Sequence, residues 1–156
     1  MNAQASFQGE PLLILLVEDN AAHARLVMRS LADHQIANRV VHLSDGEAAL
    51  NYLFRQGDYA DPETSPRPHL VLLDLRLPRV DGLSVLQRIK NSPLQPLPVV
   101  VLTTSETESD AMAAYHNQAN SYLVKPLNFE KFSAMLQQLG FYWLAWNRYP
   151  WTHTEP

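Results

Sequence analysis

The stretch HLVLLDLRLP, residues 69–78, contains four consecutive aliphatic side chains followed by a carboxylate at Asp74. Prolines flank this short apolar run on both sides, a pattern typical of a strand that is buried on both faces. Strands of that kind belong to parallel sheets that helices cover on both sides. Asp74 is therefore expected at the C-terminal end of a buried strand, where the chain leaves the sheet.

Four further apolar runs have the same character, and segments with helical periodicity separate them. The other strand candidates are residues 12–17, 40–43, 99–103 and 121–124. Helix starts are expected at Asn20, at the S-x-x-E capping boxes 44–47 and 105–108, after Asp81, and at Asn128. Strands that alternate with helices pair in parallel through right-handed crossovers. The sequence therefore predicts an α/β fold, a doubly wound (βα)5 parallel sheet with the flavodoxin-like strand order 2-1-3-4-5.

The composition of the chain limits the kinds of partner it can bind and the places in the cell where it is expected. The chain has 156 residues, a net charge of -4 and no cysteine. The negative charge argues against nucleic acid or an anionic membrane as partner, since both need a basic surface. The longest apolar run is far too short to span a bilayer, and residues 1–10 lack the order of a signal peptide, so we expect a cytoplasmic protein. We divide the chain into an N-terminal tail (1–10), one domain (11–140) and an aromatic C-terminal extension (141–156).

Polar side chains stand at the ends of four predicted strands. Glu18 and Asp19 follow the first strand, and Asp74, Thr103 and Lys125 end or follow the third, fourth and fifth. A doubly wound sheet binds its ligands outside the carboxyl ends of its strands, so these side chains are expected to converge. Three carboxylates in one crevice repel one another unless a cation joins them, and oxygen ligands suit Mg²⁺. With a lysine and a hydroxyl beside the metal, the set predicts a site for a phosphoryl group, with Asp74 as the nucleophile.

These residues match a known family. From about Leu13 to Leu139 the chain resembles the receiver domain of bacterial response regulators. The motifs that carry the resemblance are Val17-Glu18-Asp19-Asn20, Asp74-Leu75-Arg76-Leu77-Pro78 with Asp81-Gly82, Val101-Leu102-Thr103-Thr104, and Tyr122-Leu123-Val124-Lys125-Pro126. The resemblance implies that Asp74 accepts phosphate from a phosphohistidine on a sensor histidine kinase.

The resemblance also implies a role for each neighbouring residue. Glu18, Asp19, Asp74 and the backbone carbonyl of Arg76 would hold Mg²⁺, with Glu18 acting mostly through water. Lys125 and Thr103 would bind phosphoryl oxygens, and Thr103 would swing inward. Tyr122 would change rotamer with Thr103 and alter the surface of the last two helices. The peptide bond between Lys125 and Pro126 would be cis, as it usually is in such domains.

The resemblance narrows to the small regulators that are paired with bacterial and cyanobacterial phytochromes. It rests on residues 54–59 with the proline-rich loop, 99–105, 119–122 and 140–144. Output would then run through contacts with other proteins, and a downstream phosphotransfer protein is a candidate partner.

Two positions depart from the family pattern. Arg76 stands where asparagine or lysine is common, beside the path of the attacking water together with Ser105. Gln118 replaces a glycine that commonly ends a helix, so either it adopts a left-handed conformation or the cap moves to Asn117 or Asn120.

The C-terminal extension is rich in aromatic residues, with Phe141, Tyr142, Trp143, Trp146, Tyr149 and Trp151. It is too short for an effector domain, which would need at least about 50 residues. We expect Phe141 or Leu144 to cover the sheet as a continuation of the last helix. The remaining aromatic side chains exceed what one edge can bury, so the sequence predicts a homodimer that this extension helps to form. The six scattered histidines are interpreted as structural or surface residues.

Three other interpretations remain to be weighed. A haloacid-dehalogenase-type phosphatase also uses a strand-end aspartate with Mg²⁺, but it carries a second aspartate where this chain has Arg76. A flavodoxin-like redox carrier would need a phosphate-binding loop where Glu18 and Asp19 stand. A degenerate receiver, which acts as an interaction module without phosphorylation, would not need the intact acidic, hydroxyl and lysine set.

Overall fold

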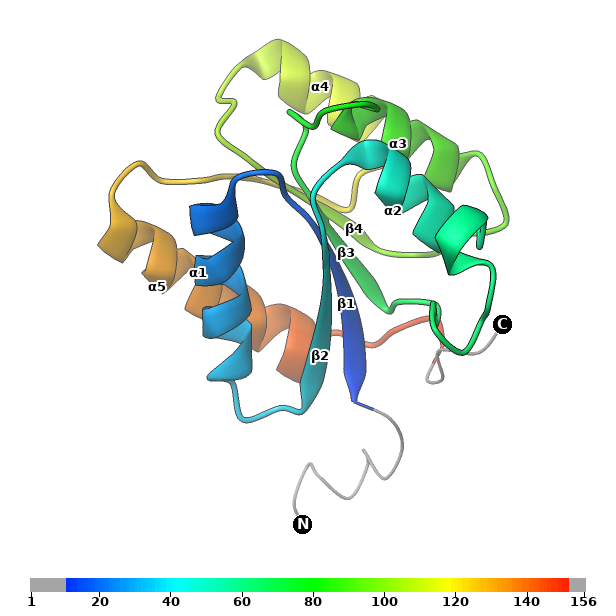
Figure 1. Cartoon of the computed structure of the whole chain (residues 1–156). Helices are drawn as coiled ribbons and strands as arrows, with labels where there is room; N and C mark the ends of the chain where they lie inside the picture. Colours follow the sequence, from blue (N-terminus) through cyan, green and yellow to red (C-terminus); the bar gives the residue numbers. More distant parts are fainter. Residues whose placement is uncertain (1–10, 152–156) are drawn as a thin grey trace.

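The computed structural model describes residues 11–151, and these form one five-stranded parallel sheet with helices on both faces (Figure 1). The strands are β1 (Leu12–Val17), β2 (Asn38–Leu43), β3 (Leu70–Leu73), β4 (Val99–Thr103) and β5 (Ser121–Val124), in the order β2-β1-β3-β4-β5. The predicted doubly wound α/β fold is confirmed. β2 begins two residues earlier than the sequence indicated, and β3 is one residue shorter at each end than the predicted strand 69–74. The predicted tail of residues 1–10 and the end of the extension at 152–156, with His153, lie outside the described residues.

Five helices alternate with the strands and cover the sheet in two layers. They are α1 (Ala21–Ala32), α2 (Gly46–Leu53), α3 (Gly82–Lys90), α4 (Glu108–His116) and α5 (Phe129–Gly140). Figure 1 shows α1 and α5 on one face and α2, α3 and α4 on the other. The aliphatic side chains of β1, β3 and β4 alternate between the two resulting cores, which explains why these strands lack a polar face. A short 3₁₀ helix, η2 (Gly57–Tyr59), lies in the proline-rich loop.

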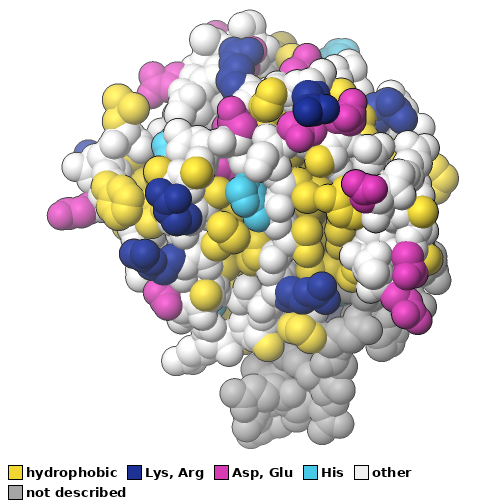
Figure 2. All heavy atoms as spheres, in the orientation of Figure 1, with side chains coloured by type: hydrophobic (Ala, Val, Ile, Leu, Met, Phe, Trp, Pro, Cys, Tyr) yellow, Lys and Arg dark blue, Asp and Glu magenta, His cyan; other side chains and the backbone are white. Residues whose placement is uncertain are grey.

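The surface of this fold is mixed in character. In the view of Figure 2, acidic and basic side chains are interspersed at the end where the strands point, and hydrophobic side chains show along the edge strand β2. No helix within residues 11–151 is long and apolar enough to cross a membrane. The loops that follow the C-terminal ends of the strands therefore form the charged end of the molecule.

The helix starts follow the sequence at three of five positions. The side chains of Asn20, Asp81 and Asn128 each accept a hydrogen bond from the first turn of their helix, as predicted. The two predicted capping boxes are wrong. Asp45 instead of Ser44 caps α2, because its carboxylate accepts the amide of Ala48 at 2.7 Å. Thr107 instead of Ser105 caps α4, because the hydroxyl of Ser105 is engaged elsewhere.

The backbone on either side of β5 tests two predictions, one for Gln118 and one for the bond between Lys125 and Pro126. Gln118 adopts a left-handed conformation with φ 69°, and the cap of α4 lies at Asn117, so features of both alternatives predicted from the sequence are present. The expected cis bond between Lys125 and Pro126 is wrong, since residues 11–151 contain no cis peptide bond. A proline peptide prefers trans by only about 0.5–1 kcal/mol, so local contacts decide the isomer.

The C-terminal extension folds back along the protein instead of projecting from it. It continues α5 as a π-helix, η3 (Phe141–Trp146), and buries Trp143 and Leu144 in the core beneath α1 and α5. The hydroxyl of Tyr149 donates to the carbonyl of Trp143. Of the two residues expected to cover the sheet, Leu144 is 1% exposed, but Phe141 is 60% exposed, because it lies on the outer side of the helix.

Trp151 then ties the end of the described chain to the opposite core. Its indole Nε1 donates to the carbonyl of Pro68 at 3.1 Å, and its ring lies 3.9 Å beneath the guanidinium of Arg67. The ring also packs against the core beneath α2 and α3. Residues 141–151 therefore span both cores, and they hold the proline-rich loop at the N-terminal end of β3.

We predict that Trp151→Ala lowers the free energy of unfolding by about 2 kcal/mol, since the half-buried ring, its hydrogen bond and its cation–π contact are lost together. Urea denaturation followed by circular dichroism measures this change. Trp146→Ala is the matched control, because Trp146 is 77% exposed and its truncation should change stability by less than about 0.5 kcal/mol. Equal losses in the two variants would contradict the tie at Trp151.

Candidate functional site

Three carboxylates meet at the carboxyl ends of β1 and β3. These strands are neighbours, with Val17 opposite Leu73, and the amide of Asp74 donates to the carbonyl of Val17 at 3.1 Å. The side chains that follow thus share one crevice, and oxygen atoms of Glu18, Asp19 and Asp74 lie within 4.8 Å of one another. Glu18 and Asp74 are buried, while Asp19 is exposed. The crevice is acidic at its base and open on the side of Asp19.

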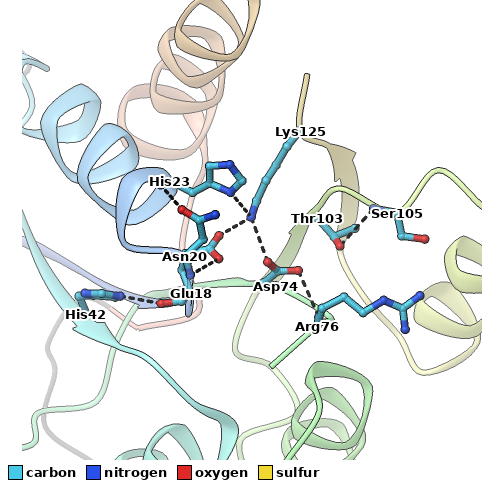
Figure 3. A network of polar contacts seen from close by, with 9 residues as sticks. All are labelled: Glu18, Asn20, His23, His42, Asp74, Arg76, Thr103, Ser105 and Lys125. Carbon is cyan, nitrogen blue, oxygen red and sulfur yellow. Dashed lines mark hydrogen bonds and ion pairs between the residues drawn. The ribbon is translucent and has the colours of Figure 1, made fainter. Parts of the chain in front are cut away.

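Lys125 places its ammonium group between the two buried carboxylates. The loop after β5 is fixed by a 2.7 Å hydrogen bond from the amide of Lys125 to the carbonyl of Thr103. The Nζ atom donates to Oδ2 of Asp74 at 2.9 Å and to Oε1 of Glu18, and it contacts Nδ1 of His23 at 3.1 Å (Figure 3). The side chain of Lys125 is 1% exposed. The charge of this lysine is therefore directed entirely into the crevice.

The pKa values of the two buried carboxylates move in opposite directions. Burial raises the pKa of Glu18 to about 7, because loss of hydration outweighs its contacts with Lys125. Burial also opposes ionisation of Asp74, but the charge and the hydrogen bond of Lys125, with donors at Arg76 and Thr103, hold the pKa of Asp74 below its ordinary value. Asp74 is thus the more readily ionised member of the pair.

The residues present fit a hard divalent cation. The three acidic side chains offer oxygen atoms, and the raised pKa of Glu18 shows that one lysine does not offset the buried negative charge. Magnesium binds through one or two carboxylates and keeps several waters, which suits a crevice that is open at the exposed Asp19. Glu18, Asp19 and Asp74 are therefore the residues that could hold the ion.

The loop after β3 is held close to Asp74 by its own backbone. The amide of Arg76 donates to Oδ1 of Asp74 at 3.2 Å, and the amide of Gly82 donates to the carbonyl of Leu75 at 2.9 Å. A Cβ atom at Gly82 would lie 2.1 Å from the carbonyl oxygen of Asp74, so this position requires glycine. Gly82, which belongs to one of the motifs of the family resemblance, is thus the residue that lets α3 start against the site.

Thr103 and Tyr122 lie on the far side of Asp74 from Glu18. Thr103 is fully buried, and its hydroxyl oxygen accepts the amide of Ser105 at 3.4 Å. The hydroxyl of Tyr122 donates to the carbonyl of Ser105 at 3.0 Å, with the ring half-buried. Both side chains therefore contact the same turn, the one that joins β4 to α4.

Comparison with known proteins assigns this architecture. Residues 14–137 match the family model described as the response regulator receiver domain. The chain belongs to that family. It is 49% identical over 143 residues to a probable methanogenesis regulatory protein, FilR2 of Methanothrix harundinacea, covering 90% of this chain and 89% of that protein. It is 47% identical over 135 residues to the response regulator Rcp1 of Synechocystis sp., covering 86% of this chain and 90% of Rcp1.

Two solved structures of such regulators superpose closely on the receiver. The crystal structure of the Mn²⁺-bound form of Rcp1 has a TM-score of 0.86 at 45% identity, and it covers 90% of this chain and 100% of that chain. The crystal structure of the phosphorylated cyanobacterial phytochrome response regulator RcpA also has a TM-score of 0.86, at 38% identity, and covers 91% of this chain and 100% of that chain. The protein is a receiver-domain response regulator of two-component signalling and not a conventional enzyme, which removes the phosphatase and redox-carrier interpretations.

Two histidines lie beside the receiver's acidic crevice, although the sequence offered no reason to single them out. Nδ1 of His23 faces Lys125, and Nε2 of His42 lies 2.8 Å from the carbonyl oxygen of Glu18. Burial and the charge of Lys125 lower the pKa of His23, so its ring is neutral and can accept a hydrogen bond from the ammonium group. By contrast, His69 has a structural role, since its Nδ1 accepts the amide of Leu13 at 3.0 Å.

We predict that Mg²⁺ binding releases protons below a pH of about 7 and that the affinity rises as the pH approaches that value. Glu18 holds a proton below this raised pKa, and a cation beside it favours the ionised form. Isothermal titration calorimetry in buffers of different ionisation enthalpy measures the proton count. The control is Glu18→Gln, in which the proton release should disappear. Release that persists in this variant would assign the proton to another group.

Proposed function

We propose that the receiver accepts a phosphoryl group on Asp74 from the phosphohistidine of a sensor histidine kinase. The observation that carries the proposal is the buried, ionised carboxylate of Asp74, held at 2.9 Å by Lys125 beside the carboxylates of Glu18 and Asp19. In this proposal Glu18, Asp19, Asp74 and the backbone carbonyl of Arg76 hold Mg²⁺. The Mn²⁺-bound form of the related Rcp1 supports a divalent metal in such a site.

Each residue around Asp74 has a part in the transfer. An oxygen of Asp74 attacks phosphorus, a P–O bond forms, the P–N bond to the kinase histidine breaks, and its electron pair returns to the imidazole. Lys125 holds the carboxylate in place and then neutralises phosphoryl charge, while Thr103 and the amide of Arg76 donate hydrogen bonds. Bound Mg²⁺ would supply further positive charge to the phosphoryl oxygens. These groups are already oriented toward Asp74 before any donor arrives.

A degenerate receiver that works without phosphate is the competing proposal. Such a module would need no buried carboxylate, and burying one costs several kcal/mol unless it is paired. Here Lys125 is enclosed with two carboxylates at a side-chain exposure of only 1%. The presence of this cluster, which is costly to bury, favours a phosphoacceptor over a degenerate receiver.

A phytochrome-type sensor kinase is the proposed phosphodonor. The support is the likeness to RcpA, which is a phytochrome response regulator, and to Rcp1. The similar FilR2 is described as a probable methanogenesis regulatory protein, so a kinase of another input class is the alternative that a phosphotransfer assay with both donors decides. Phosphate could pass onward from Asp74 to a downstream phosphotransfer protein by the reverse of the same chemistry.

The proposed readout is a change in protein contacts near α4 and α5. Four large hydrophobic side chains there are more than half exposed, and we call them the α4–α5 surface: Met112, Tyr115, Leu127 and Phe129. Thr103 and Tyr122 contact the β4–α4 turn, so an inward movement of Thr103 toward a phosphoryl oxygen would pull on that turn and on Tyr122. Exposed apolar surfaces of this kind commonly serve as protein interfaces.

We predict that incubation with Mg²⁺ and acetyl phosphate adds the mass of one phosphoryl group to the protein. Asp74→Asn should abolish the adduct, because an amide cannot attack as a carboxylate does. Intact-mass spectrometry makes the measurement, and Asp81→Asn is the control that leaves the adduct, since Asp81 only caps α3. No adduct with acetyl phosphate or with a competent kinase would favour the degenerate receiver.

We also propose a homodimer formed through the extension of residues 141–156, which we treat as separate from the receiver domain of 11–140. Three aromatic side chains of η3 remain at least half exposed and define the tail surface: Phe141, Tyr142 and Trp146. Trp143, Tyr149 and Trp151 pack against their own chain, so fewer aromatic rings are free for an interface than the sequence suggested. The tail surface is nevertheless continuous along one helical segment.

We predict that Phe141→Ser with Trp146→Ser shifts the mass in multi-angle light scattering from dimer to monomer, because both side chains are more than half exposed and the proposed interface buries them. Met112→Ser with Leu127→Ser is the control at the α4–α5 surface. Truncation after Gly140 is less informative, since it would also remove the buried Trp143 and Leu144. A dimer that persists in the tail variant and dissociates in the control would place the interface on the α4–α5 surface.

A further inference from the structure

An ion pair spans the entrance to the phosphorylation site and joins two elements that the sheet alone does not connect. Nη2 of Arg76, on the loop after β3, lies 2.6 Å from Oδ2 of Asp110 on α4. Both residues line a groove of about 450 Å³ that reaches Asp19. In Figure 3 the side chain of Arg76 points away from the carboxylate of Asp74, although its backbone amide is bonded to that carboxylate.

Asp110 is also the acceptor that organises the turn between β4 and α4. The hydroxyl of Ser105 donates to the same Oδ2 atom that receives Arg76, and the amide of Asp110 donates to Oγ1 of Thr107 at 3.2 Å. The hydrogen bond from the hydroxyl of Ser105, the charge of Arg76 and a hydrogen bond from the side chain of Thr107 lower the pKa of Asp110, so it carries a full charge at neutral pH. The carbonyl of Ser105 accepts the hydroxyl of Tyr122, so Ser105 links Asp110 to Tyr122, one of the two residues proposed to respond to phosphorylation.

Resting on the proposed function, we propose that Asp110 and the phosphoryl group on Asp74 compete for the guanidinium of Arg76. Asp110 is then a positioning residue, which keeps Arg76 away from Asp74 in the resting receiver. A phosphoryl group carries a charge of about -1.5 to -2 and accepts bidentate hydrogen bonds from arginine, so it is a stronger partner than one carboxylate. The Arg76 side chain is 68% exposed and starts beside Asp74, so nothing in its surroundings prevents the exchange.

The exchange has two consequences. At the phosphoryl group, Arg76 covers the side that faces the groove and hinders the water that would attack phosphorus, break the P–O bond to Asp74 and release inorganic phosphate. At α4, Asp110 loses its cation, and the turn that holds Ser105 loses a restraint. The lifetime of the phosphorylated form and the freedom of the β4–α4 turn are thus coupled through one arginine.

A double-mutant cycle on the loss of phosphate tests the competition. The full chain and the variants Asp110→Asn, Arg76→Gln and Arg76→Gln with Asp110→Asn are phosphorylated with acetyl phosphate, freed of the donor, and followed by phosphate-affinity gel electrophoresis. We expect Asp110→Asn to slow the loss of phosphate by about threefold, the factor that an exposed ion pair can supply. Arg76→Gln should accelerate the loss, and Asp110→Asn should then have no further effect.

The loop after β3 offers a matched control. Arg79 and Glu47 form a second exposed pair at 3.2 Å, which does not line the groove. Glu47→Gln should leave the rate unchanged, and thermal unfolding should show that every variant is folded. Slower loss from Asp110→Asn even without Arg76 would make Asp110 a direct activator of water and would overturn the proposal, as would equal rates in Asp110→Asn and the wild type. Failure of the wild type to take phosphate at all would instead sink the proposed function.

Discussion

The buried contact of Lys125 with Glu18 and Asp74 is the constraint on which the site depends. A parallel sheet in the order β2-β1-β3-β4-β5 brings the ends of β1 and β3 together and so concentrates negative charge in a place with little water. Such an arrangement is stable only if a cation is enclosed with it. Lys125 enters from beyond β4, and its backbone amide is anchored on Thr103, so its position follows from the same strand order.

That contact also explains why the two carboxylates differ. Both touch the same ammonium group, yet the pKa of Glu18 is raised to about 7 and that of Asp74 is lowered. At Glu18, burial outweighs the contacts with Lys125 and the charge of Asp74 adds repulsion, whereas at Asp74 the charge and hydrogen bond of Lys125, with the amide of Arg76 and the hydroxyl of Thr103, stabilise the ionised form. The site thereby favours ionisation of Asp74, the proposed phosphoacceptor, and leaves the protonation of Glu18 responsive to a cation.

The sequence predicts the parts of this structure that depend on periodicity and on strand ends. Asp74, Thr103 and Lys125 were found because strand order converts distant positions into neighbours. The choice between neighbouring side chains that could fill the same position was not predictable in the same way. Ser44 and Asp45 both suit a helix cap, and the structure uses Asp45, whose carboxylate accepts the amide of Ala48. His23 and Asp110 lie on helices, where their facing partners depend on rotation and packing, so no local pattern pointed to them.

The balance between the positive charge of Lys125 and the negative charges around it connects the acidic crevice to α4. The ammonium group has three donors, and Glu18, Asp74 and His23 already occupy its surroundings. Phosphorylation would replace one carboxylate charge on Asp74 by about -1.5 to -2, and Lys125, which Glu18 shares, would offset that increase only in part beside the bound Mg²⁺. The cation whose backbone already contacts Asp74 is Arg76, and Asp110 holds its side chain at the entrance. In the proposed exchange, an increase of charge at Asp74 would therefore reach α4 through Arg76, by a route that does not require Thr103 or Tyr122 to move first.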